Sequence, residues 1–202
     1  MAAAGAGAGV DLRGEATMVL DTHVITNPIS GERIVIHETG SGSGESQLAW
    51  ELMLAPGGRV PSSHAHPAQE ERFTVVSGRM RFRVGGHPIL AGPGATVVVP
   101  PETVHSFANA GPETARVLVT TTPALQMREL LETAAAMARE QHAAGRWLPH
   151  LFDLALFMSD FEREVRAPYL PVGLVRLAMR AVARLARVGG RDSRYRRLRA
   201  GA

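Results

Sequence analysis

The stretch "GRVPSSHAHPAQEERFTVVSG" (residues 58–78) places two histidines two positions apart, followed by two adjacent glutamates and a β-branched run that ends in glycine. In a β-strand, residues i and i+2 point to the same side. His64 and His66 are therefore expected to project together into the interior of the fold. The chain contains eight histidines in 202 residues, and two of them on one face of one strand favour a shared chemical role.

The alternation of side chains along the next strand indicates which glutamate points toward His64 and His66. The "HPAQEE" segment is short enough to reverse the chain, and beyond it Glu71 and Phe73 share one parity while Arg72 takes the other. Because arginine is rarely buried in a protein interior, Glu71 is expected to point inward beside the histidines. Glu70 as the ligand is the alternative.

A second stretch, "GATVVVPPETVHSFAN" (residues 94–109), offers a further donor. His105 follows a turn and shares its parity with Phe107. The chain has no cysteine, so disulfides and thiolate sites are excluded and a metal would be held by nitrogen and oxygen. Imidazoles and a carboxylate that converge from adjacent strands are a donor set for a first-row transition metal. The predicted metal ligands are His64, His66, Glu71 and His105.

From residue 17 to about residue 122 the sequence has the pattern of short strands. Apolar runs alternate with separators rich in Gly, Pro, Asn and Ser, which are the residues that turns require. The runs cover residues 33–37, 47–54, 72–78, 79–84, 95–100, 105–109 and 115–121. Many short, evenly spaced strands indicate a mainly β fold, a closed sandwich or barrel, rather than alternating strands and helices.

The period changes after Pro123. Apolar residues then recur at intervals of three and four, which predicts amphipathic helices over residues 125–145, 148–166 and 172–188. The expected organisation is a disordered lead (1–16), a β-barrel (17–122), an extension of about three helices (123–190) and a flexible basic tail (191–202).

Charge is distributed unevenly along the chain. Residues 1–165 carry 12 arginines and 18 acids, whereas residues 166–202 carry ten arginines and one acid, and lysine is absent. The predicted helix over residues 172–188 has arginines four apart on one face and can therefore lie on an anionic membrane surface. Packing of its apolar side on the barrel or on a second subunit is the favoured expectation. No helix-turn-helix is evident, so no nucleic acid partner is expected.

The N-terminal sequence does not have the pattern of a targeting signal. The first ten residues are small and uncharged and lack a basic region before an apolar core, so they are not expected to be a signal peptide. The sequence also lacks a run of 18 uncharged apolar residues of the kind that spans a membrane. A cytoplasmic location is therefore expected.

The two quoted stretches together resemble the two sequence motifs of the cupin superfamily. The first motif is matched by Gly58, His64, His66, Glu71 and Gly78, and the second by Gly94, Pro100, His105 and Asn109. Glu102 stands where the family usually has glycine, so the turn before His105 is expected to be tighter or differently shaped. The resemblance implies a double-stranded β-helix (jelly-roll) barrel, a homodimer, and one divalent metal held by three histidines and a glutamate.

Within that superfamily the sequence is similar to the bacterial single-domain cupins of the quercetin-dioxygenase-like type (cupin 2 type). This similarity favours a metal-dependent oxygenase that uses O2 on a small enol, diketone or flavonol-like substrate. With Fe, Mn, Ni or Cu such a site supports redox chemistry, and with Zn it supports Lewis-acid chemistry. The alternatives are a non-redox isomerase or cyclase and a small-molecule binding module without catalysis.

Glu71 is also the expected catalytic base, since an apolar pocket can raise the basicity of a carboxylate. Apolar walls surround most small-molecule pockets. The side chains expected to bind the substrate are Met53, Phe73, Met80, Phe82, Phe107 and Asn109.

Overall fold

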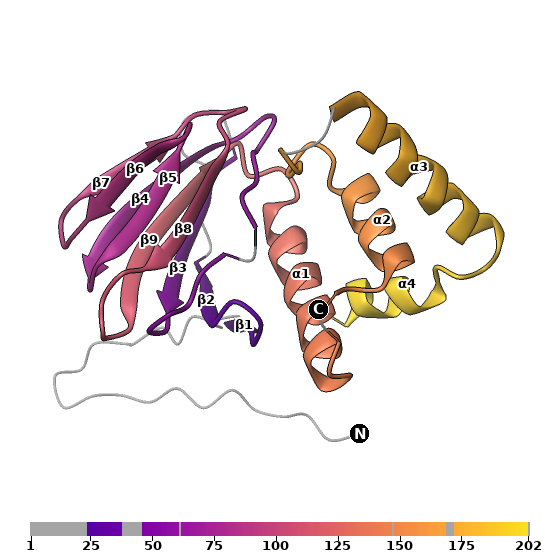
Figure 1. Cartoon of the computed structure of the whole chain (residues 1–202), viewed down its shortest axis with the longest axis horizontal. Coiled ribbons are helices and arrows are strands. Elements are labelled where there is room, and N and C mark those ends of the chain that lie inside the picture. Colours follow the sequence, from indigo (N-terminus) through magenta and orange to yellow (C-terminus); the bar gives the residue numbers. More distant parts are fainter. Residues whose placement is uncertain (1–23, 38–45, 61, 147, 169–171, 202) are drawn as a thin grey trace, which may run out of the picture.

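The structure, a computed structural model, describes residues 24–37, 46–60, 62–146, 148–168 and 172–201. These residues form nine strands and four helices. The strands come first and the helices follow, in two blocks that lie side by side (Figure 1). The expected lead over residues 1–16 lies outside the described residues. None of the described helices is long and apolar enough to cross a membrane.

The strands form two antiparallel sheets. The larger has the order β1-β2-β3-β9-β4-β7 and the smaller the order β6-β5-β8. The strands are β1 (Val24–Asn27), β2 (Glu32–His37), β3 (Leu48–Leu54), β4 (Glu70–Ser77), β5 (Met80–Val84), β6 (His87–Ala91), β7 (Thr96–Val99), β8 (His105–Asn109) and β9 (Ala115–Thr122). This jelly-roll arrangement followed by helices confirms the predicted fold class.

The barrel core is built by alternation along the strands. In β3, every second side chain is buried, and Leu52 and Leu54 have no exposed surface. In β5, Met80 and Phe82 are fully buried while the arginines between and after them face solvent. Because successive side chains of a strand point to opposite faces, this pattern closes an apolar interior between the two sheets.

The last glycine of the first motif is required by the close approach of two strands. Gly78 has φ +81°, and a Cβ atom at this position would lie 2.7 Å from the Cα atom of Ala115. A larger residue would therefore meet both backbone strain and a clash with β9.

The pattern of apolar runs and turn residues does not predict β1 and β6. β6 begins in the "VGGHP" segment, which has the composition of a turn, and its first four residues are exposed. It therefore lacks the alternation that reveals a half-buried strand. β6 lies at the edge of its sheet, which is where a strand tolerates a proline such as Pro88.

The helical extension consists of α1 (Met127–Ala143), α2 (Leu151–Asp160), α3 (Val172–Val188) and α4 (Ser193–Ala200). α1 lies next to the barrel, and α3 forms the far edge of the molecule (Figure 1). α2 ends earlier than predicted, and residues 161–166 run back to the barrel. There Ala65 and Arg166 exchange backbone hydrogen bonds of 3.1 and 2.9 Å.

α4 occupies part of the segment for which a flexible tail is expected. Its Tyr195 is 3 % exposed and belongs to a small apolar cluster with α2 and α3. Arg194 lies 2.9 Å from Glu140 of α1 and 3.3 Å from Asp153 of α2. Tertiary contacts hold this helix, and the arginine-rich sequence alone does not reveal them.

Glu102 adopts a backbone conformation that normally favours glycine. Its φ is +66°, in the left-handed region, which costs a residue with a side chain roughly 1–2 kcal/mol. Its N–H donates to the His66 carbonyl at 2.8 Å, and its carboxylate lies 2.9 Å from Arg166. A glycine would take this conformation without strain. The expected difference in turn shape stays a prediction.

Glu102→Gly is therefore expected to be more stable than Glu102→Ala by about 1 kcal/mol. Both variants lose the carboxylate, whose pair with Arg166 is solvent-exposed and contributes little, but only glycine relieves the left-handed strain. Urea unfolding of the two variants measures the difference. Equal stabilities would contradict the strain assigned to this turn.

Candidate metal centre

Four side chains from three segments converge at one end of the barrel. His64 and His66 lie in the segment between β3 and β4, Glu71 is the second residue of β4, and His105 is the first residue of β8. The backbones of His64 and His105 exchange hydrogen bonds of 3.0 and 2.8 Å. This pairing joins the two motifs directly, although they are separate in the sequence.

Glu71, the glutamate that shares its parity with Phe73, lies inside the barrel as predicted. Glu71 is 3 % exposed, whereas the Glu70 carboxylate lies at the surface, 3.2 Å from the guanidinium of Arg72. The two adjacent carboxylates therefore lie on opposite faces of β4, one buried and one exposed, as the alternation of a strand requires.

The donor atoms are close enough to share one ion. One ligand atom from each of the four residues lies within 4.8 Å of the others. Oε2 of Glu71 lies 3.2 Å from Nε2 of both His66 and His105. The ring centroids of His64 and His105 are 4.3 Å apart. Glu71, His66 and His105 are almost fully buried and His64 is half-buried.

Backbone carbonyls orient all three imidazoles. The Nδ1–H of His64 donates to the Ser62 carbonyl at 3.1 Å, and that of His105 donates to the Thr103 carbonyl at 3.2 Å. The Nδ1–H of His66 donates to the carbonyl of residue 164. With the proton on Nδ1, each Nε2 atom presents its lone pair to the centre, which is the arrangement typical of metal-binding histidines.

The buried atoms at the centre lack hydrogen-bond partners. This is so for Nε2 of His66, Nε2 of His105 and Oε2 of Glu71. Leaving buried polar atoms unsatisfied is costly, and native proteins largely avoid it. A divalent cation would satisfy all three atoms at once, so the residues present fit a metal.

Burial and mutual charge set the protonation states of the centre. Burial would raise the pKa of Glu71, but the imidazoles of His66 and His105 outweigh it and hold that pKa well below its usual range. Burial would lower the pKa of His66, yet the Glu71 carboxylate raises it. For His64, burial and then the neighbouring imidazoles lower the pKa to about 3. In the metal-free protein the two imidazoles therefore oppose the rise in basicity that burial alone would give Glu71, and its role as a catalytic base stays a prediction.

Acidification is expected to destabilise the metal-free protein through His64. Between pH 6.5 and 4.5 the unfolded chain takes up a proton at this imidazole, while the folded protein, with a pKa of about 3, does not. The free energy of unfolding therefore falls with decreasing pH, by at most ~1.4 kcal/mol per pH unit. The raised pKa of His66 stabilises the folded protein throughout this pH range, so His66 adds no slope. The contribution of Glu71, whose pKa is lowered, is lost only at lower pH.

His64→Gln should flatten this slope in urea unfolding carried out with a chelator at a series of pH values. His87→Gln, on the exposed edge strand β6, is the matched control and should keep it. A slope that is identical in the native chain and in His64→Gln would contradict the assignment.

A residue outside both motifs completes the surroundings of His66. The carbonyl of Glu164 accepts the His66 Nδ1–H, and Oε1 of Glu164 accepts the backbone N–H of Gln126 at 3.3 Å. Glu164 is buried and belongs to the segment after α2. Sequence reasoning misses it, because the atom that orients His66 is a backbone carbonyl 98 residues away and carries no signature of residue type.

Phenylalanines form an apolar floor beneath the centre. The ring centroid of Phe73 lies 6.3 Å from that of His105 and 5.3 and 5.5 Å from those of Phe82 and Phe107. Met80 is fully buried in the same core cluster. The structure brings these four predicted lining residues together, and they keep water away from the buried side of the ligands.

Two other predicted lining residues lie elsewhere. Met53 occupies the outward parity of β3, where its sulfur accepts a hydrogen bond from Arg33 at 3.2 Å. Asn109 is the last residue of β8, roughly 13 Å along the strand from His105. Its amide hydrogen-bonds three backbone groups of the surrounding loops. Met53 is absent from the centre because Leu52 and Leu54 take the inward positions, and Asn109 is absent because it closes a turn at the other end.

Residues 50–121 match the family model described as a cupin domain. The chain contains a cupin domain. The matched range includes the four side chains of the centre, and the helical extension lies outside it. No curated protein matches the sequence.

Solved structures of other cupins are similar to the barrel half of the chain. An RmlC-like cupin from Shewanella frigidimarina is 20% identical, with 54% of this chain and 89% of the other covered and a TM-score of 0.45. KdgF from a Halomonas species is 20% identical, with 50% and 86% covered and a TM-score of 0.43. Streptomyces Pac13, solved with uridine, is 16% identical, with 51% and 76% covered and a TM-score of 0.41. TM-scores below 0.5 say nothing about the substrate or the reaction.

Glu71→Gln is expected to weaken the binding of a divalent metal to the cupin domain by at least ~100-fold. The change removes the anionic donor and keeps the side-chain volume. Equilibrium dialysis of chelator-stripped protein against Zn(II), followed by elemental analysis, measures the affinity. Glu70→Gln, which changes the neighbouring exposed acid, should bind as the native chain does. Equal affinity in the two variants would rule out Glu71 as a ligand.

Proposed function

We propose that the protein is a metal-dependent cupin oxygenase that acts on a small chelating substrate such as an enol, a 1,3-diketone or a flavonol. The supporting observation is that buried imidazole nitrogens and the Glu71 carboxylate converge without hydrogen-bond partners. Three neutral nitrogens and one carboxylate oxygen suit Fe, Mn, Ni, Cu or Zn.

The chain contributes a set of buried donors that backbone carbonyls hold in place. When bound, a redox-active metal supplies the activation of O2 and of a chelated enolate, whereas a redox-silent metal supplies Lewis acidity. The three Nδ1–H bonds to carbonyls fix the imidazole rings, and the Glu71 carboxylate offsets part of the metal charge. The phenylalanine floor excludes water from the side opposite to the substrate.

The described residues place no free general base beside the four ligands. The imidazoles hold the pKa of Glu71 below its usual range in the metal-free protein, and as a metal ligand its carboxylate would be engaged by the cation. Among the described residues, the other titratable side chain buried beside the ligands is that of Glu164, and its Oε1 is held by the Gln126 N–H. An isomerase or cyclase needs a base with a pKa near the working pH. Enol chelators are acidic enough to bind as anions, which favours the oxygenase over the non-redox alternative.

The substrate would approach over the half-buried ring of His64. The opposite side is closed by the floor, and the side of His66 is closed by the segment that follows α2. A cavity of about 160 Å³ lies at the junction between this segment and the helices, lined by Pro67, Glu102, Arg166 and residues of α2 and α3. Its lining does not include the four ligands, so we place the substrate on the His64 side.

Oxygen uptake tests the proposal directly. Chelator-stripped protein is loaded anaerobically with Fe(II), Mn(II), Ni(II) or Cu(II) in turn and is then mixed with flavonols and small 1,3-diketones in an oxygen-electrode cell. At least one metal should support consumption of O2 with substrate, and Glu71→Gln should abolish it while Glu70→Gln does not.

The alternatives predict different results. No uptake with any metal and substrate, in protein that binds the metal, would overturn the oxygenase assignment. Turnover with Zn(II) in the absence of O2 would identify an isomerase or cyclase. Retention of the diketone without turnover would identify a binding module.

A further inference from the structure

Helix α3 presents a row of apolar side chains to solvent. Leu174, Leu177 and Leu185 are 66, 67 and 68 % exposed, and Val188 is 81 % exposed. With the exposed Ala181, they recur every three or four residues, which places them along one face of the helix. Within the described residues this leucine row is uncovered.

The other face of α3 already holds the helix in the fold. It packs on α2 through Met179, Val182, Ala183 and Ala186, which join the apolar cluster of α2 and α4. The sequence favours packing of the apolar side of this helix on the barrel or on a second subunit, and Figure 1 shows α3 at the far edge, beyond α2 and away from the barrel. The leucine row is therefore a second apolar face that the core does not use.

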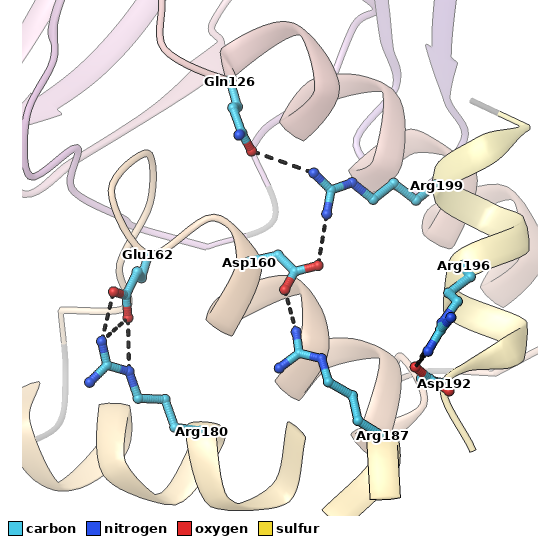
Figure 2. Close-up of polar contacts among 8 residues, drawn as sticks. All are labelled: Gln126, Asp160, Glu162, Arg180, Arg187, Asp192, Arg196 and Arg199. Carbon is cyan, nitrogen blue, oxygen red and sulfur yellow. Dashed lines mark hydrogen bonds and ion pairs between the residues drawn. The ribbon is translucent and has the colours of Figure 1, made fainter. Parts of the chain in front are cut away.

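Arginines flank the leucine row. α3 contains no acidic residue. Arg180 pairs with Glu162 and Arg187 pairs with Asp160, both acids lying at or just after the end of α2 (Figure 2). Arg184 is exposed on the same flank and forms no ion pair with any described residue. Arg176 shares Glu162 with Arg180. The arginines outnumber these two acids, so the flank keeps a net positive charge toward solvent and can meet a negatively charged partner.

We propose that this face of α3 docks on an anionic lipid surface. An amphipathic helix binds a bilayer by inserting its apolar face at the boundary of the acyl chains while arginine side chains extend to the headgroups. Basic segments are also attracted to anionic leaflets, and residues 166–202 carry ten arginines and one acid. The leucine row and the arginine flank match these two requirements on one exposed helix.

Charge distinguishes this partner from a second copy of the chain. Two copies joined through the leucine row would bring two arginine flanks together, and like charges repel across an apolar contact. A nucleic acid would match the charge but would leave the leucines against phosphates. An anionic bilayer is complementary to both the charge and the apolar row. This inference does not depend on the metal centre.

Co-sedimentation with lipid vesicles tests the proposal. The native protein should pellet with vesicles of phosphatidylcholine containing about one third phosphatidylserine, and not with phosphatidylcholine alone. The double variant Leu177→Ser/Leu185→Ser should reduce the apparent affinity by at least ~10-fold, and Arg184→Glu should reduce it by about fivefold.

The matched controls on the barrel are Leu90→Ser, at a leucine 64 % exposed on β6, and Arg81→Glu, at an exposed arginine on β5. Both should bind as the native chain does.

The inference would be overturned in three ways. The native protein could fail to pellet with anionic vesicles, or the barrel controls could lose as much binding as the α3 variants. Light scattering could instead show a dimer that Leu177→Ser/Leu185→Ser separates, with no vesicle binding, which would make a second copy the partner. Circular dichroism of each variant confirms that folding is unchanged.

Discussion

The three imidazoles of the centre each donate their Nδ1 proton to a backbone carbonyl, and this leaves three lone pairs facing one buried carboxylate. Lone pairs and a carboxylate repel one another unless a proton or a cation lies between them. The raised pKa of His66 and the lowered pKa of Glu71 are the response of the metal-free protein to this crowding. The fold therefore creates one buried point at which a proton or a cation is strongly favoured.

The helical extension is part of this arrangement although it lies outside the matched cupin domain. The carbonyl that holds His66 comes from residue 164, and the paired backbones of Ala65 and Arg166 fix that segment against the barrel. Glu102 tolerates a left-handed backbone and pairs with Arg166 on the same segment. The turn before His105, the ligand segment and the extension thus form one connected structure.

Much of the centre could be predicted from residue spacing, because side chains in a strand alternate strictly between two faces. That rule selected Glu71 over Glu70 and placed both histidines inward. The same rule places Met53 outward, because Glu51 shares its parity and Leu52 and Leu54 take the other; the prediction of Met53 as a lining residue did not follow it. The orienting carbonyl of residue 164, the edge strand β6 and the helix α4 depend on tertiary contacts or backbone atoms, which leave no pattern in the residue types.

The link between Glu164 and His66 also has a dynamic consequence. Helices at the edge of a protein open locally more often than a closed barrel core does. If the segment after α2 opened, the His66 ring would lose the acceptor that fixes its tautomer and could rotate its lone pair out of line. Phe161, which is fully buried in the barrel core cluster, opposes such opening, so the packing of this one ring would help to keep His66 aligned.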